Sequence, residues 1–216
     1  MSRPSRHLDR RLIAAARAML PETGLSGLSA RAVARRAGVN VGMFHYHFKS
    51  KEAFVRRVLG EVYEDFRVSF RDAAAGPGCA RDRLRRVLTA YAFFGRRHRA
   101  VYSVMMRELL NGSGEMVAFA RANIPDQGGE ILRLLEECRR EGSVRDLPVP
   151  ALCLFAMSSM ALPNVAATAF ERSGRTKLFG QGVRKLNEMI LSDEMIETRA
   201  DMVLAALAPV GRKRKG

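Results

Sequence analysis

Residues 29–52 read SARAVARRAGVNVGMFHYHFKSKE, and this stretch decides the fold of the chain. Ser29 is a good N-cap for a short helix, and Gly38 ends that helix because glycine readily adopts the left-handed conformation found just after helices. A second short helix is expected over residues 41–48, and Ser50 caps a longer helix behind it. Two short helices joined by a tight turn, with another helix beginning at once behind them, form a helix-turn-helix.

The residue types in this stretch meet the steric needs of a helix-turn-helix. The first helix needs a small side chain where the two helices cross, the turn needs a residue that tolerates positive φ, and the second helix needs an apolar anchor. Ala34, Gly38 and Phe44 fill these three positions. The core expected around them consists of Val33, Ala37, Val39 and Phe48, packed against Leu12, Ala16 and Leu20.

The positive charge of the chain is concentrated at its two ends. The net charge is +15 over 216 residues. Residues 1–60 hold 12 basic and 3 acidic residues, which gives +9, and residues 212–215 add +4, so only +2 belongs to residues 61–211. Such a charge points to a polyanionic partner, either nucleic acid or an anionic membrane surface. Its confinement to the end that carries the helix-turn-helix favours nucleic acid.

The remainder of the chain shows helical spacing and helix punctuation without useful period-two alternation, so the predicted fold class is all-α. A first helix is expected to be capped by Asp9 and to end at Gly24. Later helices are expected over about 51–72, 80–97, 100–110, 125–141, 150–170 and 192–207. Residues 172–191 carry no clear signal beyond a loop with a short helix.

Residues 151–170 contain no charged side chain and are as long as a membrane span. Several polar residues and a proline interrupt this stretch: Ser158, Ser159, Pro163, Asn164 and Thr168. These residues favour a helix buried on most sides within a protein, or between two copies of it, over a membrane helix. We therefore expect no membrane partner.

No arrangement of residues indicates catalysis, so we expect no enzyme activity, no cofactor and no metal. His45 and His47 point about 200° apart on a helix and cannot chelate one ion. Ser113 lies in a GSGE sequence and not in a nucleophile elbow. The cysteines lack ligand-like spacing and indicate buried thiols in a reducing compartment: Cys79, Cys138 and Cys153.

Residues 9–60 resemble the TetR family of transcriptional regulators. The resemblance rests on three segments: RRLIAAARAMLPETGLSGLS over residues 10–29, ARAVARRAGV over residues 30–39, and NVGMFHYHFKSKEAF over residues 40–54. It covers about a quarter of the chain. The length and helical layout of the rest agree with the ligand-binding and dimerisation body of that family.

The resemblance implies an all-α fold with an amino-terminal three-helix helix-turn-helix DNA-binding head over residues 1–50. A larger helical ligand-binding and dimerisation body follows over residues 51–211, and residues 212–216 form a basic disordered tail. The implied partners are double-stranded operator DNA, a second copy of the chain and a small-molecule effector. A homodimer would place its two recognition helices in successive major grooves, about 34–36 Å apart.

Carried over by residue, the resemblance implies a DNA-binding set comprising Ser29, Arg31, Val41, Gly42, Met43, His45, Tyr46, His47 and Lys51. Within it, Arg31 is implied to contact a base or a phosphate, the start of the second short helix reads bases, and its later residues face phosphates. The sequence departs from the usual family pattern at two positions. A tyrosine usual at the place of His45 is shifted to Tyr46, and a threonine usual at the place of Met43 is absent.

Aromatic and methionine side chains outside the head could line an effector pocket, because methionine suits an adaptable apolar site. The same side chains would also suit an ordinary hydrophobic core. Given the resemblance, an effector pocket and a core are equally good interpretations of them. The candidates are Phe93, Phe94, Met105, Met106, Phe119, Phe155, Met157, Met160 and Asn164. Asn164 either orients a ligand or forms a hydrogen bond across a dimer interface.

The function implied is a ligand-responsive, sequence-specific transcriptional regulator. We expect a repressor released from its operator by a small apolar effector, in the bacterial cytoplasm and associated with the nucleoid. Three alternatives stay open: an activator of the same fold, a nonspecific basic nucleic-acid-binding protein, and a helical small-molecule-binding protein or enzyme whose basic head is incidental. The nonspecific protein would lose affinity steeply with salt and prefer no site.

Overall fold

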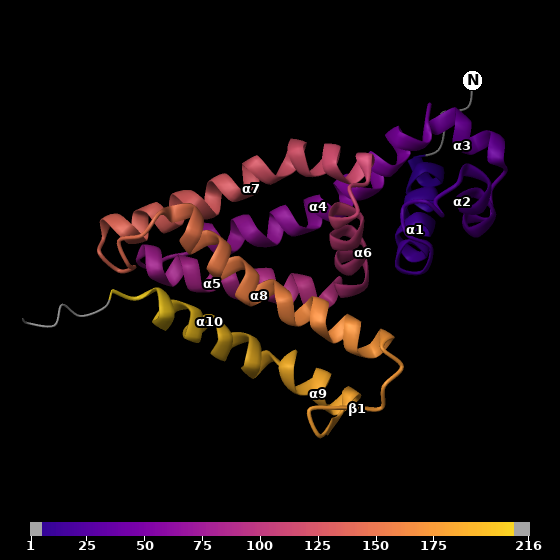
Figure 1. Cartoon of the computed structure of the whole chain (residues 1–216). Helices are drawn as coiled ribbons and strands as arrows, with labels where there is room; N and C mark the ends of the chain where they lie inside the picture. The colour runs from indigo at the N-terminus through magenta and orange to yellow at the C-terminus, as the bar shows by residue number, and fades with distance from the viewer. Residues whose placement is uncertain (1–5, 210–216) are drawn as a thin grey trace, which may run out of the picture. The chain divides into compact units, whose positions relative to one another are not determined.

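The helices of the computed structural model follow the punctuation of the sequence (Figure 1). The structure describes residues 6–209, without the side chains of residues 6, 7 and 124–128. The predicted basic tail lies outside the described residues. The helices are α1 (Arg6–Thr23), α2 (Ala30–Ala37), α3 (Val41–His47), α4 (Lys51–Ala75), α5 (Ala80–Arg97), α6 (Arg99–Leu110), α7 (Gly114–Arg140), α8 (Val149–Arg172), α9 (Val183–Ile190) and α10 (Asp193–Leu207).

The all-α prediction is confirmed, and the chain divides into two compact units. The amino-terminal unit comprises residues up to Asp65 together with Ala100–Asn123. The carboxy-terminal unit comprises Phe66–Arg99 together with the residues from Ile124 onward. Helices α4 and α7 each contribute to both units, so each unit is described separately.

In the amino-terminal unit, α1 packs against α2 and α3, and α2 packs against α3. The predicted core of the head is confirmed, because Leu12, Leu20 and Val33 are completely buried. Residues from α4, α6 and α7 complete this core: Phe54, Val55, Val58, Leu59, Val104, Met116 and Phe119. An ion pair of 2.8 Å between Arg17 and Asp65 joins α1 to α4 at the surface.

In the carboxy-terminal unit, α5 packs against both α8 and α10, and α8 packs against α10 and α9 (Figure 1). The core residues of these helices include Leu84, Leu88, Ala92, Leu152, Ala156, Met160, Ile196, Ala200 and Leu207. Arg85 donates two hydrogen bonds to the Asp201 carboxylate, at 2.6 and 2.9 Å, and thereby links α5 to α10. The hydrogen bond from Arg85 lowers the pKa of Asp201 below its ordinary value.

The structure differs from the sequence prediction at two helix starts and within the segment that was left unassigned. Helix α1 begins at Arg6, so Asp9 lies in its first turn and does not cap it. Helix α7 begins at Gly114, before the predicted start at residue 125. The prediction took the proline at residue 125 as the start of a helix, whereas it falls inside a longer one. Residues 177–182, within the unassigned segment, form a small antiparallel hairpin.

That hairpin pairs β1 (Lys177–Leu178) with β2 (Gln181–Gly182). Its turn residues Phe179 and Gly180 both adopt positive φ, at 50° and 75°. Strands of two residues are too short to produce recognisable alternation, which is why the sequence pattern did not show them. The hairpin leads directly into α9.

Helix α8 is long and apolar enough to cross a membrane by length and composition. Only 22% of its most apolar window is buried. Of the two predicted alternatives, burial on most sides within one chain is therefore wrong, because α8 packs one face against α5 and α10 and exposes Leu154, Phe155 and Leu162. Burial between two copies of the chain stays a prediction.

Candidate nucleic-acid interface

The turn between α2 and α3 is held by the caps that the sequence predicts. The Ser29 hydroxyl oxygen accepts a hydrogen bond of 3.2 Å from the Ala32 backbone N–H, as an N-cap does. Gly38 has φ 64° and ψ 40°, a left-handed conformation in which a side chain would be strained. The Gly38 and Val39 N–H groups donate to carbonyl oxygens in the last turn of α2, at 3.2 and 3.0 Å.

Helix α3 has an N-cap of its own that the sequence analysis missed. The Asn40 Oδ1 accepts a hydrogen bond of 2.7 Å from the Gly42 backbone N–H. Asparagine directly before a helix is a strong N-cap signal, and it was available in the sequence. Together with Gly38, this cap fixes where α3 begins.

Aromatic packing fixes how α3 is rotated. Phe44 is 1% exposed, and its ring centroid lies 4.8 Å from that of Phe54 at the start of α4. The Phe48 ring lies 4.7 Å from the same Phe54 ring. The opposite face of α3 is open to solvent, with Tyr46 65% exposed and Val41 37% exposed. Helix α3, the candidate recognition helix, is therefore anchored on one face by the buried Phe44 ring and exposed on the other, as a helix that enters the major groove requires.

The structure brings the predicted DNA-binding residues together on α2, α3 and the first turn of α4. Six of them are exposed: Ser29, Arg31, Val41, Gly42, His45 and Tyr46. Met43, His47 and Lys51 are half-buried. The Lys51 ammonium donates to the Ser26 carbonyl oxygen at 3.3 Å, which holds the lysine beside the loop before α2 and leaves two donors for another acceptor.

Comparison with known proteins agrees with this geometry. Residues 12–58, from α1 into α4, match the family described as bacterial regulatory proteins, tetR family. The chain belongs to the TetR family. It is thus a helix-turn-helix transcriptional regulator from a family of DNA-binding proteins and not of enzymes, and the family implies binding to operator DNA.

Individual relatives of this TetR-family chain are distant. It is 23% identical over 155 residues to the "Probable HTH-type transcriptional regulator YttP" of Bacillus subtilis (strain 168), an alignment that covers 71% of this chain and 75% of that protein. The solved structure of the TetR-family regulator PfmR from Thermus thermophilus superposes with a TM-score of 0.66 at 16% identity, covering 90% of this chain and 97% of PfmR. A tetR-family regulatory protein from Rhodococcus RHA1 gives 0.66 at 18% identity, covering 92% and 98%. These structures share the fold.

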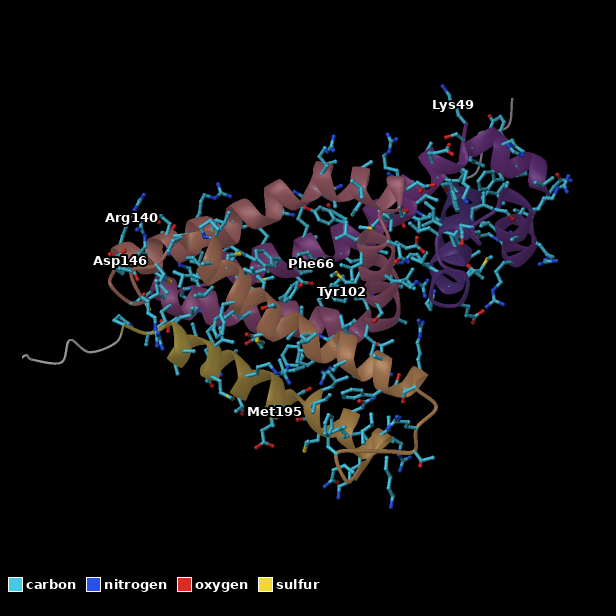
Figure 2. The ribbon with its side chains drawn as sticks, in the orientation of Figure 1. Lys49, Phe66, Tyr102, Arg140, Asp146 and Met195 are labelled. Atoms are coloured by element: carbon cyan, nitrogen blue, oxygen red, sulfur yellow. The ribbon has the colours of Figure 1, made fainter. Side chains whose placement is uncertain are left out.

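Two basic residues beside the TetR-family motif were absent from the predicted set. Lys49 is exposed between α3 and α4, and its side chain extends away from the ribbon (Figure 2). Arg11 on α1 donates a hydrogen bond of 2.7 Å to the Ala37 carbonyl oxygen at the end of α2. A cation at the C-terminal end of a helix also interacts favourably with the helix dipole. Lys49 was visible as a cation in the motif, whereas the Arg11 contact depends on the tertiary fold.

The predicted effector-pocket residues are distributed over the two units. Met105, Met106 and Phe119 belong to the amino-terminal unit. The others belong to the carboxy-terminal unit: Phe93, Phe94, Phe155, Met157, Met160 and Asn164. Among these, Phe155 is 46% exposed, whereas Met160 is completely buried in the core.

Asn164 is the most deeply buried of three polar side chains that are buried among the described residues of the carboxy-terminal unit, the others being Thr168 and Asn187. Its side chain is 2% exposed, and its Oδ1 has no hydrogen-bond partner among the described residues. A Cβ atom on Gly95 of α5 would lie 2.7 Å from the Asn164 Nδ2, so glycine is needed there for the amide to fit. A buried acceptor without a donor costs free energy, which a ligand or partner that donates a hydrogen bond could recover.

Proposed function

We propose that this TetR-family regulator is a homodimeric repressor that reads its operator with α3 and releases it when a small apolar effector binds. The observation that carries the DNA-reading role is the exposed face of α3, held in place by the buried ring of Phe44. We assign DNA binding to a head of residues 1–50, and effector binding and dimerisation to a body of residues 51–211. As a bacterial transcription regulator, the protein works in the cytoplasm, and operator binding would associate it with the nucleoid.

The side chains of α3 set the expected mode of reading. Val41 and Met43 carry no hydrogen-bond donor, so they can read only thymine methyl groups and groove shape. Arg31 is exposed at the start of α2 and is the hydrogen-bonding base reader in this proposal. His45, Tyr46, His47 and Lys51 provide the contacts to phosphates, with Ser29 and Gly42 beside the backbone of the duplex.

Selection of bound sequences from a random DNA pool by the purified protein tests the proposal. We expect two related half-sites in twofold symmetry, centred about one helical turn apart or a multiple of it. In the same selection, Arg31→Ala should lower the discrimination between bases at one base pair of each half-site by about 1–3 kcal/mol. Lys51→Ala should instead lower the affinity for all sequences alike and reduce the salt dependence of binding.

Arg57→Ala is the matched control, because Arg57 lies on α4 and pairs with Glu61 at 3.6 Å, away from α3. It should leave both the selected sequence and the affinity nearly unchanged. Absence of any enriched sequence would favour the nonspecific nucleic-acid-binding alternative. Equal losses on selected and random DNA from Arg31→Ala would remove Arg31 from base reading.

The effector proposal is supported by Asn164, whose buried Oδ1 receives no hydrogen bond from any described residue and lies next to an apolar core. A mostly apolar compound with one donor would suit that surrounding. From a library of such compounds, those that raise the melting temperature should lower operator affinity by about 1–3 kcal/mol, a common size for allosteric coupling. Asn164→Leu, which keeps the volume and removes the acceptor, should weaken both effects.

Compounds that bind without changing operator affinity would contradict the proposal that effector binding in the body lowers the affinity of the head for the operator. Transcription in vitro from a promoter that contains the operator decides the sign of control. Repression that such a compound relieves supports the proposal, and a higher transcript yield with bound protein would assign the activator alternative.

A further inference from the structure

The turn between α2 and α3 contains backbone acceptors that neither helix uses. The last four carbonyl groups of an α-helix have no partner within the helix itself. At the end of α2, the N–H groups of Gly38 and Val39 donate to two carbonyl oxygens of the last turn, at 3.2 and 3.0 Å. The carbonyl oxygens of Ala37 and Gly38 receive no backbone hydrogen bond from the described residues. The turn therefore needs donors from another part of the chain.

Arg11 of α1 supplies these donors. Its Nη2 group donates to the Ala37 carbonyl oxygen at 2.7 Å and to the Gly38 carbonyl oxygen at 3.4 Å. A charged donor makes the shorter and stronger kind of hydrogen bond, and a helix C-terminus favours positive charge. A Cβ atom on Gly38 would lie 3.4 Å from the same nitrogen, so the guanidinium lies directly over the turn.

The packing of α1 determines where the Arg11 side chain begins. Leu12 and Ile13, the next two residues, are buried in the core of the amino-terminal unit. Ala15, one helical turn after Arg11, is also buried. Arg11 thus lies at the edge of the core, and its guanidinium extends from there to the end of α2. The contact joins residues that are 26 positions apart in the sequence, so it depends on the tertiary fold.

Helix α3 is consequently fixed at two separate places. The buried ring of Phe44 anchors the middle of the helix. Arg11 holds Gly38, three residues before the helix begins at Val41. Val41 and Met43, which the proposed function assigns to base reading, lie between these two places. Because a binding constellation has to be held within about 0.5 Å of its productive geometry, the start of α3 has to be held as well as its middle.

We propose that Arg11 is a positioning residue for the recognition helix. It holds the α2–α3 turn against α1 and thereby sets where the reading end of α3 lies in the major groove. In this role Arg11 acts through the turn and contacts neither a base nor a phosphate. The proposal rests on the proposed reading of DNA by α3, and it makes discrimination between DNA sequences depend on a residue outside α2 and α3.

A direct contact with a phosphate is the competing role for an exposed arginine in this unit. Removal of a phosphate contact lowers the affinity for every sequence and reduces the salt dependence of binding. Loss of positioning lowers the affinity for the operator, because contacts to base edges carry the sequence information and random DNA is held by its backbone. The two roles therefore differ in the affinity for random DNA and in the salt dependence.

Hydrogen exchange of the free protein, followed by mass spectrometry, tests whether Arg11 holds the turn. In the Arg11→Ala protein, the amide hydrogens of residues 38–43 should exchange at least about threefold faster, because local opening of the turn costs less free energy. Arg11→Lys keeps a charged donor and should exchange nearly like the unaltered protein. Unchanged exchange of residues 38–43 in the Arg11→Ala protein overturns the proposal. This result is independent of the selection experiment, which tests the proposed function by itself.

Arg10→Ala is the matched control for the exchange measurement. Arg10 is the adjacent residue on α1, and its exposed side chain forms no hydrogen bond or ion pair with a described residue. The substitution removes the same charge from the same helix, so exchange of residues 38–43 should not change. Equal acceleration in the Arg10→Ala and Arg11→Ala proteins would assign the effect to charge alone and overturn the role of the Arg11 hydrogen bonds.

Fluorescence anisotropy with the most enriched duplex from the selection, and with a random duplex, tests the consequence for DNA reading. Arg11→Ala should lower the affinity for the enriched duplex about five- to tenfold, an effect of the size expected when a charged hydrogen bond at an exposed site is lost. Its affinity for the random duplex and its salt dependence should match those of Arg10→Ala. Arg11→Lys should recover most of the affinity for the enriched duplex.

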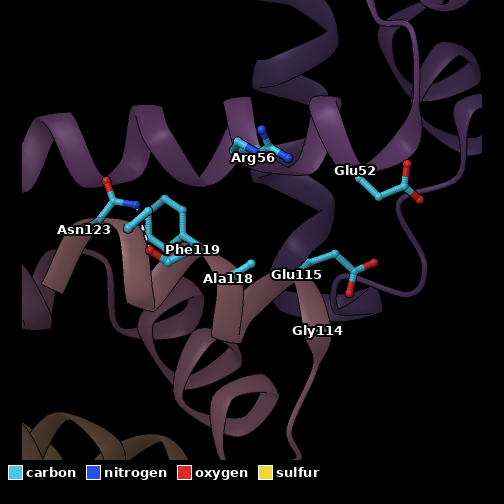
Figure 3. A pocket seen from close by; sticks show the side chains of 8 residues that line it. Glu52, Arg56, Gly114, Glu115, Ala118, Phe119 and Asn123 are labelled. Atoms are coloured by element: carbon cyan, nitrogen blue, oxygen red, sulfur yellow. Dashed lines mark hydrogen bonds between the residues drawn. The ribbon is translucent and has the colours of Figure 1, made fainter.

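Arg56→Ala is a second control within the same unit. Arg56 is exposed at an open groove between the first turns of α4 and α7, and none of the described residues that line this groove belongs to α1, α2 or α3 (Figure 3). Its removal should leave the ratio of the two affinities unchanged. Equal losses on both duplexes from Arg11→Ala, with a reduced salt dependence, would make Arg11 a phosphate contact and overturn the positioning role. Undiminished affinity of Arg11→Ala protein for the enriched duplex also overturns it.

Discussion

We expect Phe44→Ala to lower the free energy of unfolding by about 3–5 kcal/mol, as removal of a buried phenylalanine ring does. The ring is 1% exposed and lies against Phe48 and Phe54, at centroid distances of 5.5 and 4.8 Å. Truncation leaves a cavity under α3 that its short, capped backbone cannot close. Chemical denaturation followed by circular dichroism measures the loss, and operator binding should disappear with it.

Tyr46→Ala is the matched control for that prediction. It removes an aromatic ring from the same helix two residues away, but Tyr46 is 65% exposed. Substitutions at exposed positions without special contacts usually change stability by less than about 0.5 kcal/mol. If the two variants lost the same stability, the rotation of α3 described above would be wrong.

The head could be predicted from the sequence because its signals are local. Ser29 and Gly38 each determine a helix end through their own side chain or backbone freedom, within a few residues of the groups they contact. Phe44 occupies the position where the second helix of a helix-turn-helix needs an apolar anchor, so its burial followed from its place in the motif. Asn40 is equally local, and it was missed although the sequence contained the signal.

The features that could not be predicted depend on distances between segments far apart in the chain. Nothing in the sequence places Arg11 against the Ala37 carbonyl, or Asn164 against Gly95. The effector-pocket candidates were selected by residue type, and methionine and phenylalanine suit the core of either unit equally well.

Helix α8 has one face that is buried in the carboxy-terminal unit and another that is exposed. Leu152, Ala156 and Met160 are buried in the core of the carboxy-terminal unit. Leu154 and Leu162 are 72% and 64% exposed. Exposed apolar side chains that gather on one helix commonly indicate an interface. On α10, which packs against α8, Met202 is also 64% exposed, so α8 and α10 together offer the surface for the proposed dimer.

The double variant Leu154→Arg with Leu162→Arg should therefore be monomeric. Burying an arginine side chain in an apolar interface costs free energy unless the charge is paired. A twofold interface would contain each introduced arginine twice, once from each copy. Operator affinity should fall by a factor of about 100 or more, because the second half-site is then no longer bound intramolecularly. Analytical ultracentrifugation measures the mass, and fluorescence anisotropy with operator DNA measures the affinity.

Leu110→Arg provides the control. It introduces the same charge at a leucine that is 81% exposed and that belongs to α6 in the amino-terminal unit, whereas α8 belongs to the carboxy-terminal unit. It should stay dimeric and keep its operator affinity. A double variant that remained dimeric would move the interface to another surface. A double variant that became monomeric yet bound its operator as before would separate DNA binding from dimerisation, and would leave the twofold reading of the operator without support.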